Sequence, residues 1–209
     1  MHRSLTLAAL ILAASTPALG PHRAAGEETR TAIFAGGCFW CVESDFDEVP
    51  GVLETVSGYT GGTTEKPTYR DVTNGGTGHH EAVRITYDPA QVSYEALLTA
   101  FWHSVDPTDA GGQFCDRGPS YETAVFVLDE EQRRAAEASK AAAQESLEDP
   151  IVTPIEDATT FWPAEDYHQG YYEKNPLQYK YYRWSCGRDA RIEQVWGKDA
   201  FKGIPDHQS

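Results

Sequence analysis

The sequence lacks long apolar runs, has few positive charges and contains almost no methionine. No stretch of about 18 consecutive apolar residues occurs, which argues against an ordinary transmembrane helix. Lysine and arginine number 17 against 32 aspartates and glutamates, and the formal net charge of −15 argues against nucleic-acid binding, which needs a cationic surface. Met1 is the only methionine, so no later side chain can be damaged by oxidation to methionine sulfoxide.

The apolar content of the sequence is sufficient for a folded domain. The 209 residues are 40% hydrophobic and 11% aromatic, which is typical of a soluble globular protein and too aromatic for a disordered one. No repeat or low-complexity linker divides the chain. We therefore expect one domain over residues 27–209, which ends in a tail from about residue 171.

The N-terminus has the pattern of a secretory signal. His2 and Arg3 precede an apolar segment over residues 5–14, and the small residues 24–26 offer a cleavage site. We expect a signal peptide over residues 1–26 and export, to the periplasm where the organism has one; an uncleaved anchor or a disordered tail is the alternative. An exported chain meets oxidising conditions, so its four cysteines can form disulfides.

The hydrophobic pattern predicts short strands and helices that alternate irregularly. This order favours an α+β fold over a doubly wound one. We expect a two-layer sandwich with a ferredoxin-like core, a mixed or antiparallel sheet and an irregular C-terminal tail. The expected strands are 31–35, 52–59, 81–87, 121–128 and 151–155, and the expected helices are 38–47, 93–101 and 129–147, with a helical turn at 67–72.

Cys38 has the sequence context of a reactive thiol. It follows Gly36-Gly37, which predicts a tight turn, and it opens a predicted helix. Free backbone N–H groups and the helix dipole stabilise an anion at that position, so we expect a lowered thiol pKa. Phe39 and Trp40 follow and could shape an apolar pocket, while Cys41 completes a Cys-x-x-Cys pair.

A Cys-x-x-Cys pair is compatible with other functions. It could be half of a zinc site, but no second ligand pair with the required spacing is present. It could belong to a general thiol–disulfide oxidoreductase that uses Cys38 and Cys41. The chain could also be an exported binding module in which all four cysteines are locked in disulfides.

The segment Gly36–Cys41 resembles the signature of the peptide methionine sulfoxide reductase A family. Further similar blocks follow in the family's order and cover about residues 31–176. They are Ser57–Gly62, Pro67–Arg70, Gly78–Val83, Tyr87–Pro89, Phe101-Trp102, Asp106-Pro107, Cys115–Gly118 with Tyr121, Phe161–Glu165 and His168-Gln169. Two positions depart from the pattern, His80 and Glu122, and could alter substrate preference or the local potential.

The resemblance implies that Cys38 is the nucleophile and that Glu81 donates a proton to the sulfoxide oxygen. The sequence supports Glu81 independently, because it shares the face of a predicted strand with Val83, Ile85 and Tyr87. Burial on that face would raise the carboxyl pKa and keep the group protonated near neutrality.

The resemblance also implies roles for side chains around the sulfoxide. Tyr69 and Tyr121 resemble the tyrosines that hydrogen-bond its oxygen, and Asp116 resembles a buried aspartate that orders them. Phe39 and Trp40 would hold the S-methyl group.

The sequence does not decide which cysteine forms the disulfide with Cys38 after the oxygen is transferred. A Cys38 sulfenic acid condenses with a nearby thiol to form a disulfide. Cys41 is our first choice, because three positions on a helix keep it close. Cys186 could resolve instead, or relay the disulfide outward. Cys115 could be an inert thiol, half of a structural bridge with Cys186, or a redox participant.

By this resemblance the protein is a peptide-methionine (S)-S-oxide reductase that repairs oxidised proteins or reduces free methionine sulfoxide. We expect no metal or organic cofactor, and electrons from a thioredoxin-like protein. We also expect no nucleic-acid partner, no membrane span after signal cleavage and a monomer.

Overall fold

The computed structural model describes residues 29–205. The predicted signal peptide therefore lies outside the described residues. Within residues 29–205, no helix combines the length and apolarity needed to cross a membrane.

The core of the fold is one six-stranded sheet with the order β7-β6-β1-β3-β2-β8. All neighbouring strands are antiparallel except β6 and β7, which are parallel. The pairing of β2 with β3 places Tyr59 opposite Glu81. The strands are β1 (Arg30–Gly36), β2 (Val52–Thr60), β3 (His80–Tyr87), β6 (Thr123–Val127), β7 (Ile155–Asp157) and β8 (Trp162–Pro163), and a small second sheet pairs β4 (Gly112–Gln113) with β5 (Asp116–Arg117).

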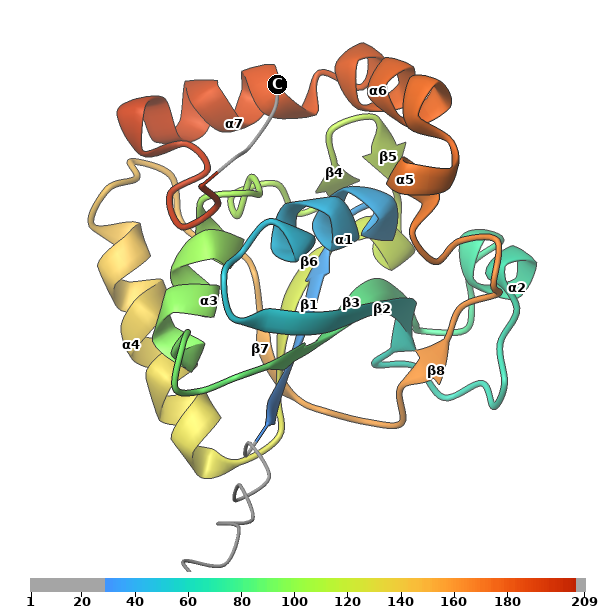
Figure 1. Ribbon diagram of the computed structural model, residues 1–209, viewed down its shortest axis with the longest axis horizontal. Helices are drawn as coiled ribbons and strands as arrows, with labels where there is room; N and C mark the ends of the chain where they lie inside the picture. Colours follow the sequence, from blue (N-terminus) through green and yellow to red (C-terminus); the bar gives the residue numbers. More distant parts are fainter. Residues whose placement is uncertain (1–28, 206–209) are drawn as a thin grey trace, which may run out of the picture.

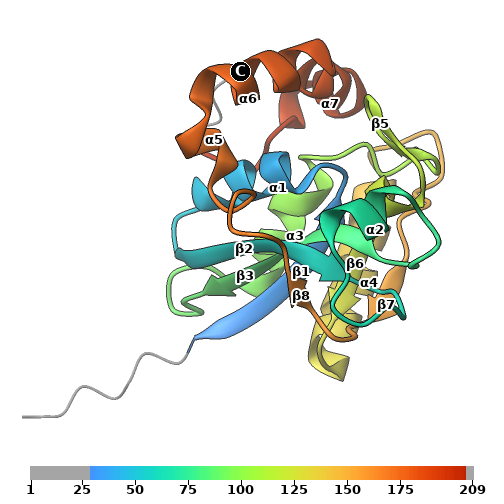
Figure 2. The same ribbon diagram turned by 90° about the vertical axis from the view of Figure 1, so that its right-hand side faces the viewer.

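Helices cover one face of the large sheet (Figures 1 and 2). They are α1 (Phe39–Asp47), α3 (Tyr94–Trp102) and α4 (Glu130–Gln144), which share a single apolar core with that face. Phe34 lies at the centre of this core, with its ring stacked on Phe101 at 4.9 Å. The opposite face is covered by the connection before β8, where Ala158 and Phe161 pack on a smaller cluster. The expected α+β class with a mixed sheet is confirmed.

Most predicted elements are present, and their caps explain where the helices begin. Ser93 accepts a hydrogen bond from the backbone N–H of Ala96, and Asp129 accepts one from Gln132. The predicted helical turn is α2 (Tyr69–Thr73), and a 3-10 turn, η1 (Pro119–Tyr121), precedes β6.

The prediction of a strand at 151–155 is wrong, because the strand begins only at Ile155. The backbone N–H groups of Ile151 and Val152 donate to the Gln144 side chain and to the Pro107 carbonyl. This segment is therefore held by loop contacts and not by the sheet.

The C-terminal segment is not an irregular tail. It forms α5 (Tyr171–Lys174), α6 (Pro176–Ser185) and α7 (Arg188–Trp196), followed by η2 (Gly197–Asp199). Both α6 and α7 lie beyond α1, on the side away from the sheet (Figures 1 and 2). The prediction failed because α6 buries Arg183 and exposes Leu177, Tyr181 and Trp184, so its hydrophobic pattern does not follow burial.

Candidate active site

The Cys38 turn joins the end of β1 to the start of α1. Gly37 has φ +82°, a conformation that side chains with a Cβ rarely adopt. A Cβ at Gly37 would also lie 2.5 Å from the Cβ of the buried Gln113. Gln113 is itself fixed, because its side-chain amide accepts from the Asp106 N–H and donates to the Asp106 carbonyl. The turn is therefore shaped by packing as well as by backbone geometry.

We expect Gly37→Ala to lower the free energy of unfolding by roughly 3 kcal/mol, through the unfavourable φ and the collision with Gln113. Gly76→Ala is the matched control, since Gly76 has φ +87° with nothing within 4 Å of an added Cβ. Gly76→Ala should lower the free energy of unfolding by only about 1 kcal/mol. Urea unfolding measures both, and equal losses would contradict the packing argument.

Cys38 and Cys41 are both buried free thiols, 6% and 2% exposed, in one cluster with Tyr179. Burial, with the Cys41 and Glu81 charges, raises the pKa of Cys38 well above its usual value. The hydrogen bond from Cys38 lowers the pKa of Cys41 to about 7.

The expected lowering of the Cys38 pKa is thus wrong for the resting site. Desolvation outweighs the helix terminus, and the first helical N–H, that of Phe39, already donates to Glu81 Oε2 at 3.0 Å. In the reduced resting pair the anion is favoured on Cys41.

Glu81 lies on β3 with 1% of its surface exposed, as the strand pattern predicts. Burial raises its pKa to about 8, although hydrogen bonds from the Phe39 N–H and the Tyr121 hydroxyl oppose the shift. The expectation of a buried carboxyl that is protonated at neutral pH is confirmed. Such a group can give a proton to an oxygen atom that enters the site.

The two predicted tyrosines lie beside Glu81. A hydrogen bond joins the Tyr69 and Tyr121 hydroxyls, and burial raises the pKa of Tyr69 to about 12 and that of Tyr121 further. Both phenols therefore remain donors at neutral pH. Asp116 is half-buried at the start of β5 and accepts a hydrogen bond from the Tyr182 hydroxyl.

Aromatic rings form the remaining wall of the site. Phe39 packs against both Tyr69 and His168, with ring centroids 6.4 and 4.9 Å away. Trp40 is half-buried, stacks on Tyr171 at 3.7 Å and donates from Nε1 to His168 Nδ1 at 3.1 Å. Burial lowers the pKa of His168 to about 4, so its ring is neutral and presents an Nε2–H. These rings make this side of the site largely apolar.

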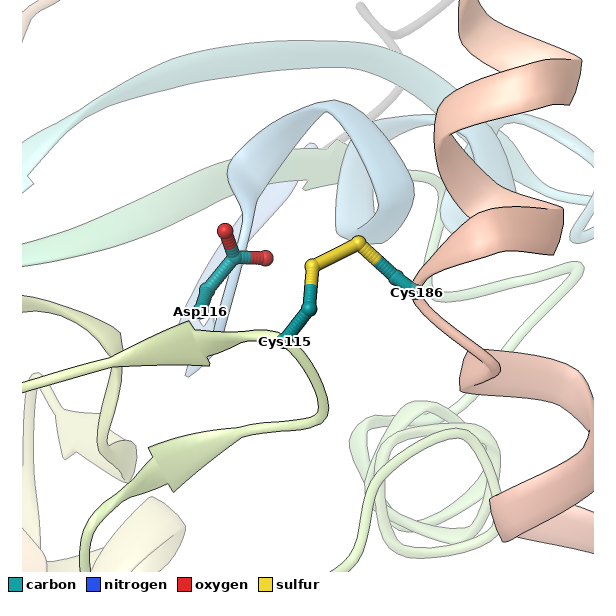
Figure 3. A group of neighbouring side chains, drawn as sticks. All are labelled: Cys115, Asp116 and Cys186. Atoms are coloured by element: carbon teal, nitrogen blue, oxygen red, sulfur yellow. A yellow bond between two sulfur atoms is a disulfide. The ribbon is translucent and has the colours of Figure 1, made fainter.

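The other two cysteines are bonded to one another (Figure 3). The Cys115–Cys186 disulfide joins the segment before β5 to the end of α6, and the two Cα atoms are 4.9 Å apart. Ligand atoms of Cys115, Asp116 and Cys186 all lie within 4.8 Å of one another. Both sulfurs are engaged in the disulfide, so the group is a bridge next to a carboxyl and not a metal site.

The two positions that depart from the family pattern contact each other away from Glu81. The ring Nδ1 of His80 lies 3.3 Å from the Glu122 backbone oxygen, and the ring packs edge-on against Phe126. Phe126 belongs to the opposite face of the sheet. The neighbouring His79 uses both ring nitrogens on backbone groups, those of Gly62 and Thr64.

Several side chains at the site were not singled out from the sequence. Tyr182 hydrogen-bonds Cys38 as well as Asp116, and Arg188 donates to the Gly36 carbonyl at 3.1 Å. Both come from the C-terminal helices, whose sequence pattern carried no burial signal. His168 was noted only as part of a motif.

The geometry agrees with comparisons to known proteins. The sequence profile described as peptide methionine sulfoxide reductase matches residues 30–200. "Peptide methionine sulfoxide reductase MsrA 2" of Rhizobium meliloti is 55% identical over 88% of this chain and 91% of its own, and "Peptide methionine sulfoxide reductase MsrA" of Bacillus subtilis is 53% identical over 82% and 98%.

A solved structure is similar as well. That of "Methionine sulfoxide reductase A of Corynebacterium diphtheriae" matches with a TM-score of 0.65 and 33% identity, over 77% of this chain and 81% of that one. The chain belongs to the peptide methionine sulfoxide reductases, oxidoreductases that reduce methionine sulfoxide.

Proposed function

We propose that this enzyme reduces the S epimer of methionine sulfoxide, free or in oxidised proteins, with Cys38 as nucleophile and Glu81 as proton donor. The observation that carries the proposal is the meeting of Cys38, Cys41 and a carboxyl of pKa about 8 in one buried site. Tyr69 and Tyr121 would bind the sulfoxide oxygen, with Asp116 ordering the site, and Phe39 and Trp40 would hold the S-methyl group. The enzyme would act as a monomer.

The first step transfers the oxygen atom. Glu81 protonates the sulfoxide oxygen as its bond to the methionine sulfur breaks, and an S–O bond forms at Cys38. The methionine sulfur gains two electrons and the Cys38 sulfur loses two. The proton of the Cys38 thiol replaces the one that Glu81 gave, so the products are methionine and Cys38 sulfenic acid.

In the second step Cys41 resolves the sulfenic acid. The Cys41 thiolate attacks the Cys38 sulfur, the S–S bond forms as the S–O bond breaks, and the hydroxide that leaves takes a proton from Glu81 to become water. Glu81 is then protonated again from solvent. Cys41 is favoured because it already hydrogen-bonds Cys38, whereas Cys186 is engaged with Cys115. Electrons pass only through cysteines in this scheme.

A dithiol protein of the thioredoxin type would reduce the Cys38–Cys41 bond and restore the enzyme. Yeast Mxr1, which shares the fold at a TM-score of 0.50 and 20% identity, has been solved in complex with Trx2. That complex motivates the choice of donor to be tested for this chain.

The resolving step is tested by a single turnover of reduced enzyme with each sulfoxide epimer, followed by mapping of the disulfides. We expect reduction of the S epimer only, and a Cys38–Cys41 bridge. Cys41→Ser should still release one methionine and accumulate a sulfenic acid that dimedone traps. The Cys115→Ser/Cys186→Ser double variant is the control and should form the Cys38–Cys41 bridge normally. A Cys38–Cys186 bridge in the parent protein would contradict the assignment.

We further propose that the protein is exported after removal of residues 1–26. The proposal is supported by the signal-like N-terminus and by the Cys115–Cys186 disulfide, which is stable in oxidising compartments. N-terminal sequencing of the protein from fractionated cells tests it, and an intact Met1 on cytoplasmic protein would refute it.

A further inference from the structure

A buried ionic cluster is centred on Asp45, one helical turn after Cys41 on α1. Asp45 is 2% exposed. Arg183 of α6 and Arg188 of α7 approach its carboxylate at 2.8 and 3.7 Å. Two guanidinium groups are therefore buried next to the turn that carries both thiols.

The two arginines differ in how their charge is balanced. Arg183 is held by two carboxylates, those of Asp45 and Asp189, at 2.8 Å each. Arg188 is 1% exposed and directs its hydrogen bonds to neutral carbonyls, those of Gly36 at 3.1 Å and Ser104 at 2.9 Å. Its Nε–H has no hydrogen-bond partner among residues 29–205.

A buried cation that is incompletely paired is costly, and a nearby anion stabilises it. The Gly36 carbonyl that Arg188 holds lies two residues before Cys38, so the guanidinium lies under the Cys38 turn. Its charge is among those that favour the anionic form of Cys41. The same arrangement that fixes the turn therefore also favours negative charge on Cys41.

We propose that Arg188, supported by Arg183 and Asp45, is a positioning residue that holds the sulfur of Cys41 as an anion ready to attack Cys38 sulfenic acid. The inference rests on the proposed resolving role of Cys41. It gives the buried Arg183–Asp45–Arg188 cluster a use in the second step of the reaction, where a thiolate is the attacking species.

Other ionisable groups also act on Cys41, and the test must separate their effects from that of Arg188. They come from the turn before α1 and from α1, β3, α6 and α7, and are Cys38, Asp45, Glu81, Tyr179, Tyr182, Arg183 and Arg188. Arg188→Met removes one positive charge and keeps an apolar stem. Asp45→Asn removes a negative charge from the same cluster, so electrostatics requires shifts of opposite sign.

The thiolate of Cys41 can be titrated alone in Cys38→Ser protein, because Cys115 and Cys186 are bonded to each other. Thiolate ultraviolet absorbance against pH should show a midpoint about one unit higher with Arg188→Met added, and a lower midpoint with Asp45→Asn. Arg188→Lys should restore part of the shift. Arg134→Met, which removes an exposed arginine on α4, is the matched control and should leave the midpoint unchanged.

In protein with all cysteines intact, quenched-flow mapping should show sulfenic acid decay slowed about fivefold at pH 7 by Arg188→Met, because a pKa raised by one unit from about 7 reduces the thiolate fraction by that factor. Unmoved midpoints in both cluster variants, or shifts of the same sign, would overturn the role of Arg188. Shifted midpoints with no Cys38–Cys41 bridge in the parent would instead refute the resolving role of Cys41, and with it the purpose proposed for the cluster.

Discussion

Replacing Cys38 with serine is expected to abolish the reduction of methionine sulfoxide. A thiol accepts the sulfoxide oxygen by becoming a sulfenic acid, and the hydroxyl of serine has no corresponding reaction. Single-turnover release of methionine should fall at least about 1,000-fold. The exchange is small and the side chain is buried without capping α1, so the fold should persist.

Two further measurements make the Cys38 result specific. Cys41→Ser should still release one methionine per enzyme, because it lacks only the second thiol. Unfolding by urea should show that Cys38→Ser protein is folded. Cys38→Ser protein that keeps the parent rate would remove Cys38 from the mechanism.

Glu81→Gln is expected to slow sulfoxide reduction by about 100- to 10,000-fold, the usual range for loss of a general acid. Glu81 has a pKa of about 8, so the parent protein keeps its acid in the protonated form up to that pH. The variant must draw protons from solvent, whose supply falls tenfold with each pH unit. The ratio of the parent rate to the variant rate should therefore grow up to about pH 8 and then level off.

The ratio of rates is the informative quantity, because it removes pH effects that are common to both proteins. The Glu81 charge also acts on Cys38, so the thiol titration is measured in both proteins and its contribution to the ratio is subtracted. Single-turnover rates from pH 5.5 to about 9.5 measure it. A constant ratio across this range would show that Glu81 does not supply the proton. An unchanged rate would place Glu81 outside the mechanism altogether.

The same substitution should stabilise the fold, which separates lost catalysis from lost structure. The folded pKa of Glu81, about 8, is above the ordinary value of 4.5. At pH 7 the folded protein keeps the proton and the unfolded chain releases it, so this group costs stability as pH rises from about 4.5 to about 8. Glutamine cannot ionise and can still accept from the Phe39 N–H, so Glu81→Gln should raise the free energy of unfolding at pH 7 by roughly 3 kcal/mol.

Predictions from short sequence patterns are correct where the environment of a residue is set by its near neighbours in the chain. The alternation of Glu81, Val83, Ile85 and Tyr87 predicts one buried face, and all four side chains are buried. The Gly-Gly turn before Cys38 predicts a strand-to-helix junction, because glycine alone tolerates φ +82° next to Gln113. Ser93 and Asp129 mark helix starts by capping chemistry that involves only near neighbours.

Predictions of this kind failed where distant segments decide the environment. Burial, the neighbouring Cys41 and the Glu81 charge raise the pKa of Cys38, although the helix terminus alone would lower it. The C-terminal helices were missed because they bury arginines and expose Leu177 and Trp184. Arg183 and Arg188 are buried because they meet Asp45 of α1, more than 130 residues earlier in the chain.

The sequence by itself determined the α+β class, the family, Cys38 as the candidate nucleophile and the burial of Glu81. These follow from periodicity, turn chemistry and ordered motifs, which are local properties of the chain. Only the tertiary structure decided the cysteine partners, bonding Cys115 to Cys186 and leaving Cys38 beside Cys41. Only it decided which thiol favours the anion, because that depends on desolvation and on charges that α6 and α7 bring to α1.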